Sequence, residues 1–313
     1  MISNLIVAIE AVAPMFIIIF IGAMIRKVNI ITEAEAKRFN KVVFICCFPP
    51  LMFNNLYGKN IGDAVNLRLL AYAVITVLVL YAVTVIVVLK VEKAQKTRGA
   101  MIQAIYRSNF VIMGIPIVQN VFGKGDLALT AVLVTVVVPM YNILAVITLE
   151  VFRGGKPSFR EMVRDLAKNP IIIGAFFGIL SIVFSVKLPQ ALEMPIELLA
   201  DAATPMALLM LGASFNFSSV SREKRNLIIC LTGRLLVFPL VGITGAILLG
   251  FRGVAIMSLL AMFASPSAIT SFTMAQQMDS DYELAGNAVI FSSAISCITM
   301  FLWIFVLKTM GMF

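Results

Sequence analysis

Ten apolar runs follow one another along the chain, each as long as a helix that crosses a bilayer. Such a helix needs about 20 mostly apolar residues. The runs cover residues 4–25, 36–57, 67–89, 97–122, 127–151, 169–186, 191–216, 226–250, 253–277 and 284–307. This pattern predicts an all-α polytopic membrane protein with ten transmembrane helices.

Two of these runs, the fourth and the ninth, are interrupted by helix-breaking residues. Gly114 and Pro116 lie in the fourth run, and Pro266 lies between two serines in the ninth. Proline lacks an amide donor and clashes with the carbonyl of the preceding turn, whereas glycine leaves helical geometry at little cost. Inside a bilayer, unwound backbone survives only where it is buried in protein or lines a wet cavity. We therefore expect breaks at Gly114–Pro116 and at Ser265–Ala268.

Prolines and glycines also recur at a nearly constant spacing between two halves of the chain. The offset is 156 residues for the first three pairs and 150 for the last: Pro14 and Pro170, Gly22 and Gly178, Pro49 and Pro205, Pro116 and Pro266. Each half then holds five spans, and an odd number of spans inverts the second copy in the membrane. The sequence thus predicts two inverted five-helix repeats, residues 1–153 and 169–313, a transporter design with the substrate site at the repeat interface.

Residues 154–168 join the two repeats and show the pattern of a short amphipathic helix. Ser158 and Glu161 have the spacing of a capping box, as do Thr32 and Glu35 before the second run. The linker's apolar face and its basic residues are Phe159, Met162, Val163 and Leu166 against Arg160, Arg164 and Lys168. Such a helix lies at the inner membrane surface or merely connects the halves, and both roles stay open.

Composition and charge exclude a soluble protein. Hydrophobic residues make up 61% of the chain and the mean hydropathy is +1.01, whereas a soluble domain is about 45–50% apolar. The net charge of +9 falls between the apolar runs, which favours topology and anionic lipids over nucleic acid as its cause. The loops after odd-numbered runs hold 17 Lys and Arg residues and the other side holds 6. The positive-inside rule places the former in the cytoplasm and both termini outside the plasma or inner membrane.

The chain lacks the side chains of common catalytic and metal sites. It has no histidine, and its four cysteines lie in apolar runs without metal-ligand spacing: Cys46, Cys47, Cys230 and Cys297. A Ser-His pair and a histidine proton relay are excluded. We therefore expect no enzyme, no metal site and no cofactor, while a passive channel stays an alternative.

The two breaks favour an organic anion as ligand. Each broken helix has a new N-terminal end, where free N–H groups carry about half a positive charge. Small hydroxyl side chains can add hydrogen bonds, although helix packing is the alternative role for them. The residues expected to contribute are Gly114, Ile115 and Pro116 at one break and Ser265, Pro266, Ser267 and Thr270 at the other.

Arg107 lies within the fourth run, two residues before Asn109. A cation inside the membrane costs a few kcal/mol and marks substrate paths, and a guanidinium binds a carboxylate through two parallel hydrogen bonds. We expect Arg107 to contact substrate, with snorkelling or a structural carboxylate partner as alternatives. For Arg234, nearer the start of its run, a structural or lipid-facing role is expected.

Four further polar residues lie in apolar runs. Asn142 and Asn287 are expected to contact substrate or to form hydrogen bonds between helices. Glu10 and Asp201 are candidates for titrating groups that couple protons to transport, or for caps near the outer interface.

Longer motifs resemble one known family. The motifs are Asn109-x3-Met-Gly-Ile-Pro116, Pro205-Met-Ala-x2-Met-Leu-Gly212 and Ala288-Val-Ile-Phe291. They resemble the auxin efflux carrier family, which includes bacterial malate and malonate permeases and plant auxin carriers, and the similarity covers nearly the whole chain. The resemblance implies that broken helices four and nine cross, that a transport part moves against a scaffold in an elevator mechanism, and that the protein is a homodimer. It places Asn109, Pro116 and Pro266 at the substrate site.

We therefore expect a secondary active transporter or facilitator of small organic anions such as malate or malonate. The alternative is a cation-coupled symporter or a cation/proton antiporter on the same architecture. An antiporter would need carboxylates beside the breaks, and none lies within several residues of Pro116 or Pro266. Protons and sodium both stay open as coupling ions. The expected partners are the anion, membrane lipids and a second copy of the chain.

Overall fold

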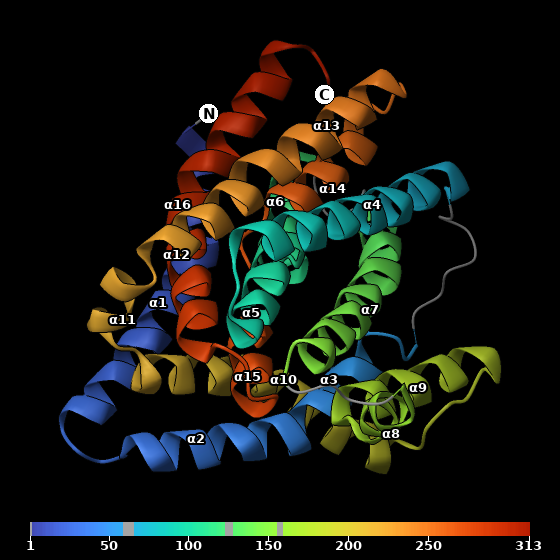
Figure 1. Ribbon diagram of the computed structural model, residues 1–313. Helices are drawn as coiled ribbons and strands as arrows, with labels where there is room; N and C mark the ends of the chain where they lie inside the picture. Colours follow the sequence, from blue (N-terminus) through green and yellow to red (C-terminus); the bar gives the residue numbers. More distant parts are fainter. Residues whose placement is uncertain (1, 59–65, 123–127, 155–158) are drawn as a thin grey trace.

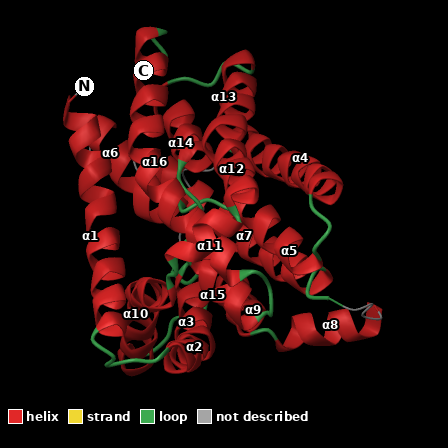
Figure 2. Cartoon of the chain, turned by 60° about the vertical axis from the view of Figure 1, so that its left-hand side comes forward, coloured by secondary structure: helices red, strands yellow, loops and turns green. Residues whose placement is uncertain are grey.

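The computed structural model describes residues 2–58, 66–122, 128–154 and 159–313, and these ranges form helices joined by short loops, with no β-strand among them (Figures 1 and 2). The helices are α1 Ile2–Lys27, α2 Glu33–Val42, α3 Phe48–Asn54, α4 Leu67–Val91, α5 Gln95–Tyr106, α6 Ile115–Phe122, α7 Ala128–Val151, α8 Phe159–Lys168, α9 Pro170–Val183, α10 Gln190–Ser214, α11 Phe217–Arg222, α12 Lys224–Thr232, α13 Phe238–Leu248, α14 Gly253–Ala264, α15 Thr270–Gln277 and α16 Tyr282–Thr309. The all-helical class predicted from the sequence is confirmed.

Described helices occupy all ten apolar runs. Within the described residues, five are long and apolar enough to cross a membrane: Leu67–Val91, Ala128–Val151, Gln190–Ser214, Lys224–Leu248 and Tyr282–Thr309. The chain is therefore a multi-pass membrane protein, and the full ten-span topology stays a prediction. The start of α1 and the end of α16 lie at the same end of the molecule (Figures 1 and 2).

Polar caps set several helix starts as the sequence indicates. The capping box between Thr32 and Glu35 is confirmed at the start of α2. Asn169 accepts the amide of Ile171 at 3.0 Å, and Pro170 occupies the first turn of α9, where its missing amide costs nothing. The amphipathic linker forms α8, while Ser158, the expected cap of that helix, lies outside the described residues.

In the part of the chain that the structure describes, three π-helical turns interrupt the long helices: η1 Val43–Cys47, η2 Phe110–Gly114 and η4 Gly233–Val237. Each is followed by one residue and then a proline, namely Pro49, Pro116 or Pro239. A proline cannot donate the usual intrahelical hydrogen bond and collides with the preceding turn. The wider π turn accommodates that collision, so the helix axis continues past the proline instead of stopping there.

Small residues allow two helix pairs to approach closely. A Cβ added at Gly22 of α1 would lie 2.1 Å from the carbonyl oxygen of Leu209 in α10, and one added at Gly212 would lie 2.0 Å from that of Ile19. In the second pair, a Cβ at Gly174 of α9 would lie 2.4 Å from the carbonyl oxygen of Pro49 in α3. Backbone contact of this kind is how helices pack where apolar lipid removes the hydrophobic drive.

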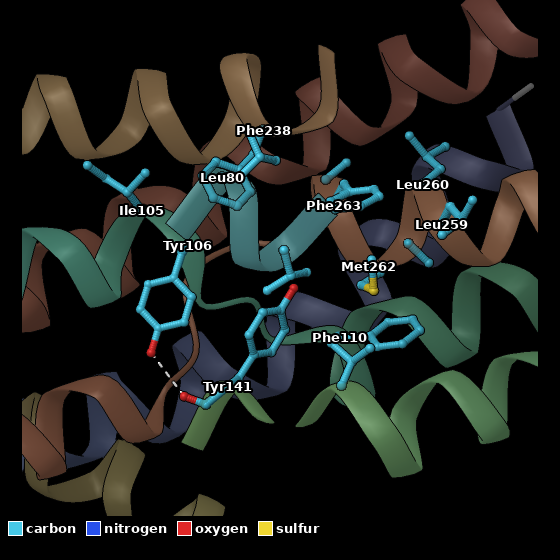
Figure 3. Close-up of a cluster of buried hydrophobic side chains, with 14 of the residues drawn as sticks. Leu80, Ile105, Tyr106, Phe110, Tyr141, Phe238, Leu259, Leu260, Met262 and Phe263 are labelled. Atoms are coloured by element: carbon cyan, nitrogen blue, oxygen red, sulfur yellow. Dashed lines mark hydrogen bonds between the residues drawn. The ribbon is translucent and has the colours of Figure 1, made fainter. Parts of the chain in front are cut away.

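The largest buried cluster lies among α4 to α7 and α12 to α16. Figure 3 shows part of it, with Phe110, Tyr141, Phe263 and Met262 around the segment where α5 and α14 end. Gly114 contributes close packing here, because a Cβ on it would lie 2.5 Å from the Phe110 ring. This cluster holds the two helix breaks in place.

Candidate functional site

Two helix breaks meet in the middle of the chain's largest cluster. Helix α5 ends at Tyr106 and α14 ends at Ala264, and the following residues are not helical. Across the gap, the amide of Asn109 donates to the carbonyl of Pro266 at 2.8 Å. Ser108 and Ser267 form an isolated antiparallel β-bridge. The two unwound segments thus provide hydrogen-bond partners for some of each other's backbone N–H and C=O groups, as a buried break requires.

The position of the ninth-run break agrees with the sequence, but the position of the fourth-run break does not. The structure unwinds Arg107–Asn109, whereas Gly114 ends the π turn η2 and Pro116 lies in α6. The physical reason is that η2 accommodates Pro116 and that Gly114 serves packing. The paired breaks, matched at Ser108 and Ser267, are offset by 159 residues (267 − 108), closer to 156 than the proline pair is.

Arg234 holds the C-terminal ends of both broken helices. It is completely buried, and its Nη1 donates to the carbonyls of Tyr106 at 2.9 Å and Ile105 at 3.3 Å. On the other helix, it donates to the carbonyls of Met262, Phe263 and Ser265. The last carbonyls of a helix lack intrahelical partners and carry partial negative charge. One guanidinium neutralises both ends, so Arg234 is structural and does not face lipid.

The π turn that carries Arg234 is fixed from the far side. Trp303 of α16 donates its indole N–H to the carbonyl of Leu235 at 3.4 Å, and the Arg234 guanidinium lies 5.2 Å from the centre of the Phe238 ring. The arginine therefore has an aromatic neighbour as well as its carbonyl partners.

Arg107 lies in the break that follows α5, and its hydrogen-bond partners are all neutral. Its exposed fraction is 2%. It donates to Oδ1 of Asn142, to Oγ1 of Thr270 at 2.5 Å and to the Met274 sulfur at 2.9 Å. No ion pair between the described residues includes Arg107. A buried guanidinium with five N–H donors and no carboxylate keeps its capacity to bind an anion.

A cavity of about 100 Å³ opens beside Arg107. Its polar lining residues are Asn55, Arg107, Ser108, Asn109, Tyr141, Asn142, Thr204 and Thr270. Its apolar lining residues are Leu51, Met52, Phe110, Val111, Ile112, Val138 and Ala268. The lining includes the first residue of η2, Phe110, and the first residue of α15, Thr270. The N-terminal, positively polarised ends of both broken helices thus lie at this cavity.

Asn109 contributes an unused donor to the same place. Its Nδ2 is buried and has no hydrogen-bond partner. An unsatisfied buried donor costs about 1–3 kcal/mol, so an acceptor placed in the cavity would recover that free energy. Asn142 lies opposite, where its Oδ1 accepts from Arg107 and its Nδ2 donates to the carbonyl of Val138 at 2.8 Å.

The structure places the other sequence-predicted residues away from the cavity. Ser265 donates to the carbonyl of Ala261 at 2.5 Å, and Ser267 donates to that of Ala104 at 2.7 Å. Pro266 contributes its carbonyl to the bridge between the breaks. Gly114, Ile115 and Pro116 are not among the lining residues.

Three further candidates lie elsewhere. Asn287 of α16 donates to the Ser219 hydroxyl at 3.0 Å, beside a separate small hollow near α11. Glu10 and Asp201 are exposed on the outside of the chain. Sequence reasoning missed Asn55 of the α3 end and Thr204 of α10, because nothing local marks a polar residue as facing a distant break.

Comparison with known proteins agrees with this architecture. Residues 7–304 match the family described as membrane transport protein. The chain belongs to this family. An uncharacterised transporter of Methanothermobacter thermautotrophicus is 25% identical over 306 residues, which cover 95% of this chain and 98% of that protein. An uncharacterised transporter of Methanocaldococcus jannaschii is 22% identical over 304 residues, which cover 94% of this chain and 97% of that protein.

The family also links the chain to plant proteins. Auxin efflux carrier component 1 of Arabidopsis thaliana is 27% identical over 139 residues, which are 42% of this chain and 22% of the plant protein. The resemblance to the auxin efflux carrier family is confirmed. Membership is in a transporter family and not in an enzyme family.

Proposed function

We propose that this membrane transport protein carries small organic anions and binds a carboxylate group in the cavity between the two breaks. The observation that carries the proposal is the Arg107 guanidinium, which lines the cavity with no acidic partner among the described residues. A carboxylate there would accept hydrogen bonds from the Arg107 guanidinium and from the side-chain Nδ2 of Asn109, which has no other partner. It would also meet the positive ends of η2 and α15.

The size of the cavity favours a short carboxylate. Its volume is about 100 Å³, whereas one water needs roughly 10–15 Å³ measured in this way. The space therefore fits a molecule with the bulk of several waters, such as malonate or malate. The apolar lining residues, Val138 and Phe110 among them, would contact the carbon chain.

Alternating access is proposed as movement of the breaks against α3 and α10. The cavity is lined by Leu51 and Asn55 near α3 and Thr204 of α10 on one side, and by the breaks, α7 and α15 on the other. The expected inverted repeat is supported by packing: Gly22 of α1 contacts α10 through Leu209, and its counterpart Gly178 of α9 contacts Leu56 at the α3 end. The two glycines thus pack against chain segments that belong to corresponding spans, the seventh and the second.

A polar contact marks the surface along which such movement would occur. Asn40 of α2 is buried. Its Nδ2 donates to Gln276 at 2.7 Å, and its Oδ1 accepts from Thr273 at 2.9 Å, both in α15. A few hydrogen bonds of this kind are easily exchanged, unlike the backbone-to-backbone contact between α1 and α10.

Cation transport on the same architecture is less well supported. No Asp or Glu is among the described residues that line the cavity, and hard cations prefer carboxylate and carbonyl oxygens. Proton coupling through Glu10 or Asp201 stays a prediction, which a pH gradient tests directly.

The deciding experiment is uptake of labelled malonate and malate by purified protein in liposomes. Arg107→Met is expected to abolish uptake, and Asn109→Ala to reduce it, whereas the exposed Arg38→Met on α2 serves as the matched control and should transport normally. Uptake by Arg107→Met at the control rate would contradict the proposed site. Uptake that is unchanged by a pH gradient would exclude proton coupling.

The movement is tested by cross-linking. In a variant without the four native cysteines, Asn40→Cys with Thr273→Cys joins α2 to α15 at a pair whose side chains are hydrogen-bonded at 2.9 Å. Oxidation is expected to stop uptake and reduction to restore it. Full uptake by the cross-linked protein would contradict sliding at this surface.

A further inference from the structure

An apolar groove on the outer surface of the helices leads to a basic hollow. The groove has a volume of about 370 Å³ and lies between α4 and the α12–η4–α13 helix. Its rim is formed by apolar side chains that are about half exposed, including Val83, Val87 and Ile228. Its floor contains Leu80, Ile105 and Phe238, which Figure 3 shows on neighbouring helices.

The hollow begins where the groove ends. Both are lined by Ile228 and Ile229, and the hollow is otherwise lined by Ser221, Arg222, Lys224 and Arg225. Arg222 is paired with Glu223 and Glu283. Arg225 uses one N–H on the carbonyl of Val91 at 3.2 Å, where α4 ends. Arg225 also interacts electrostatically with the Glu92 carboxylate. The exposed Lys224, together with the remaining donors of Arg225, presents positive charge at the mouth of the groove.

We propose that this surface binds one anionic phospholipid, with an acyl chain in the groove and the phosphate on Lys224 and Arg225. The apolar rim alone would accept any lipid tail, and the charge alone would accept any anion. Their continuity over Ile228 and Ile229 fits a molecule that carries both in one piece. Basic pockets beside membrane helices hold acidic headgroups for this reason.

The groove adjoins Arg234 and the helix-end carbonyls that it binds, which together are called the clamp. Ile105 forms part of the floor and its carbonyl accepts from Arg234, while Gly233, the residue before Arg234, lines the groove as well. A bound acyl chain therefore packs against the back of the clamp. The proposal does not depend on the transported substrate, and its test uses no transport measurement.

The test is thermal unfolding of purified protein in detergent with three additions: phosphatidylglycerol, phosphatidylcholine with the same chains, and glycerol phosphate. A ligand that binds the folded state raises the unfolding midpoint. Only phosphatidylglycerol is expected to raise it. An equal effect of phosphatidylcholine would show unselective lipid binding, and an equal effect of glycerol phosphate would show a plain anion site; either overturns the proposal.

Matched variants locate the effect. Lys224→Gln with Arg225→Gln is expected to weaken phosphatidylglycerol binding roughly 30-fold, since each basic residue contributes about 1 kcal/mol near an anionic surface. The exposed pair Arg38→Gln with Lys41→Gln on α2 should not.

A second pair tests the groove itself. Val83→Trp fills the groove and should remove the rise in unfolding midpoint that phosphatidylglycerol causes. Leu78 is exposed on α4 outside the groove, so Leu78→Trp should retain that rise. A full shift in Val83→Trp or in the charge variant overturns the proposal. So does conversion of a dimer to a monomer by Val83→Trp with the shift intact, since the groove would then be an interface between copies.

Discussion

The amide of Asn109 donates to the carbonyl of Pro266 and thereby joins two helix breaks that are far apart in the sequence. The bond brings the start of η2 and the start of α15 to one cavity and turns the opposite helix ends toward Arg234. Positive helix ends and Arg107 therefore gather on one side, and the negative ends gather on the other. This division is the physical basis of the proposed preference of the cavity for anions.

Loss of the Arg234 side chain is expected to destabilise the protein severely. Arg234→Met leaves the carbonyls of both helix ends buried without a donor, at a cost of about 3 kcal/mol or more. The loss of stability is measured as the fall in the thermal unfolding midpoint in detergent. Arg252→Met is the control, because Arg252 also donates to backbone carbonyls but is exposed. Equal midpoints for the two variants would contradict the clamp.

Arg107→Met is expected to change the stability of the ligand-free protein little but to remove anion binding. Its partners are two polar side chains and a sulfur atom, and a buried cation without a carboxylate is itself costly. The ligand-free variant should unfold much closer to the wild type than Arg234→Met does. It should nevertheless lose any rise in midpoint caused by malonate, and a retained rise would place the anion elsewhere.

Gly212→Ala is expected to destabilise by about 1–3 kcal/mol, because the added Cβ would overpack the contact between α1 and α10. That Cβ would lie 2.0 Å from the backbone oxygen of Ile19, which cannot move aside. At Gly99 the nearest atom would be the Ser280 hydroxyl at 3.2 Å, a side-chain atom that needs to shift by only a few tenths of an ångström and so can keep its hydrogen bond to the Lys96 carbonyl. Gly99→Ala should therefore be nearly neutral, and unfolding midpoints compare the two.

Glu92 makes stability depend on pH at the end of α4, outside the membrane spans. Its carboxylate accepts the Ala94 amide at 2.8 Å, which is the main cause of its lowered pKa, and also accepts from Asn226 at 2.8 Å. A lowered pKa contributes stability above the ordinary value of 4.5, and this stability is lost as the pH falls through the folded-state value.

Glu92→Gln should accordingly lower the unfolding midpoint at pH 7, and the difference from the wild type should shrink as the pH falls below 4.5 and through the lowered folded-state pKa. The exposed Glu197→Gln on α10 provides the comparison. A difference that stays constant from pH 7 to pH 3 would assign the effect to packing instead of charge.

The sequence predicted helices and one break well, because those features depend on local composition. Runs of about 20 apolar residues mark helices in any membrane protein, and Pro266 marks a break because both of its neighbours are small and polar. The break at Arg107–Asn109 was misplaced because no helix breaker lies there. The Asn109 backbone amide is satisfied by Pro266 and the carbonyls of Ile105 and Tyr106 just before the break by Arg234, and partners so distant in the chain leave no local signal.

The candidate site was predicted in part for the same reason. Arg107, Asn109, Asn142 and Thr270 were substrate-contact candidates and line the cavity, since polar residues in apolar runs seldom face lipid; substrate contact itself stays a prediction. Ser265 and Ser267 instead donate to carbonyls near the breaks. Whether a hydroxyl serves the backbone or a cavity depends on rotation by a fraction of a helical turn, which apolar periodicity does not resolve.

The hydrogen bond from Trp303 to Leu235 gives the protein a built-in optical probe. Trp303 is the single tryptophan of the chain, and it lies against the turn that carries Arg234. Light absorbed selectively by indole therefore reports on this one location. Any shift of the clamp during the transport cycle should change the emission of the wild-type protein, so that its motion can be followed in real time without attaching a dye.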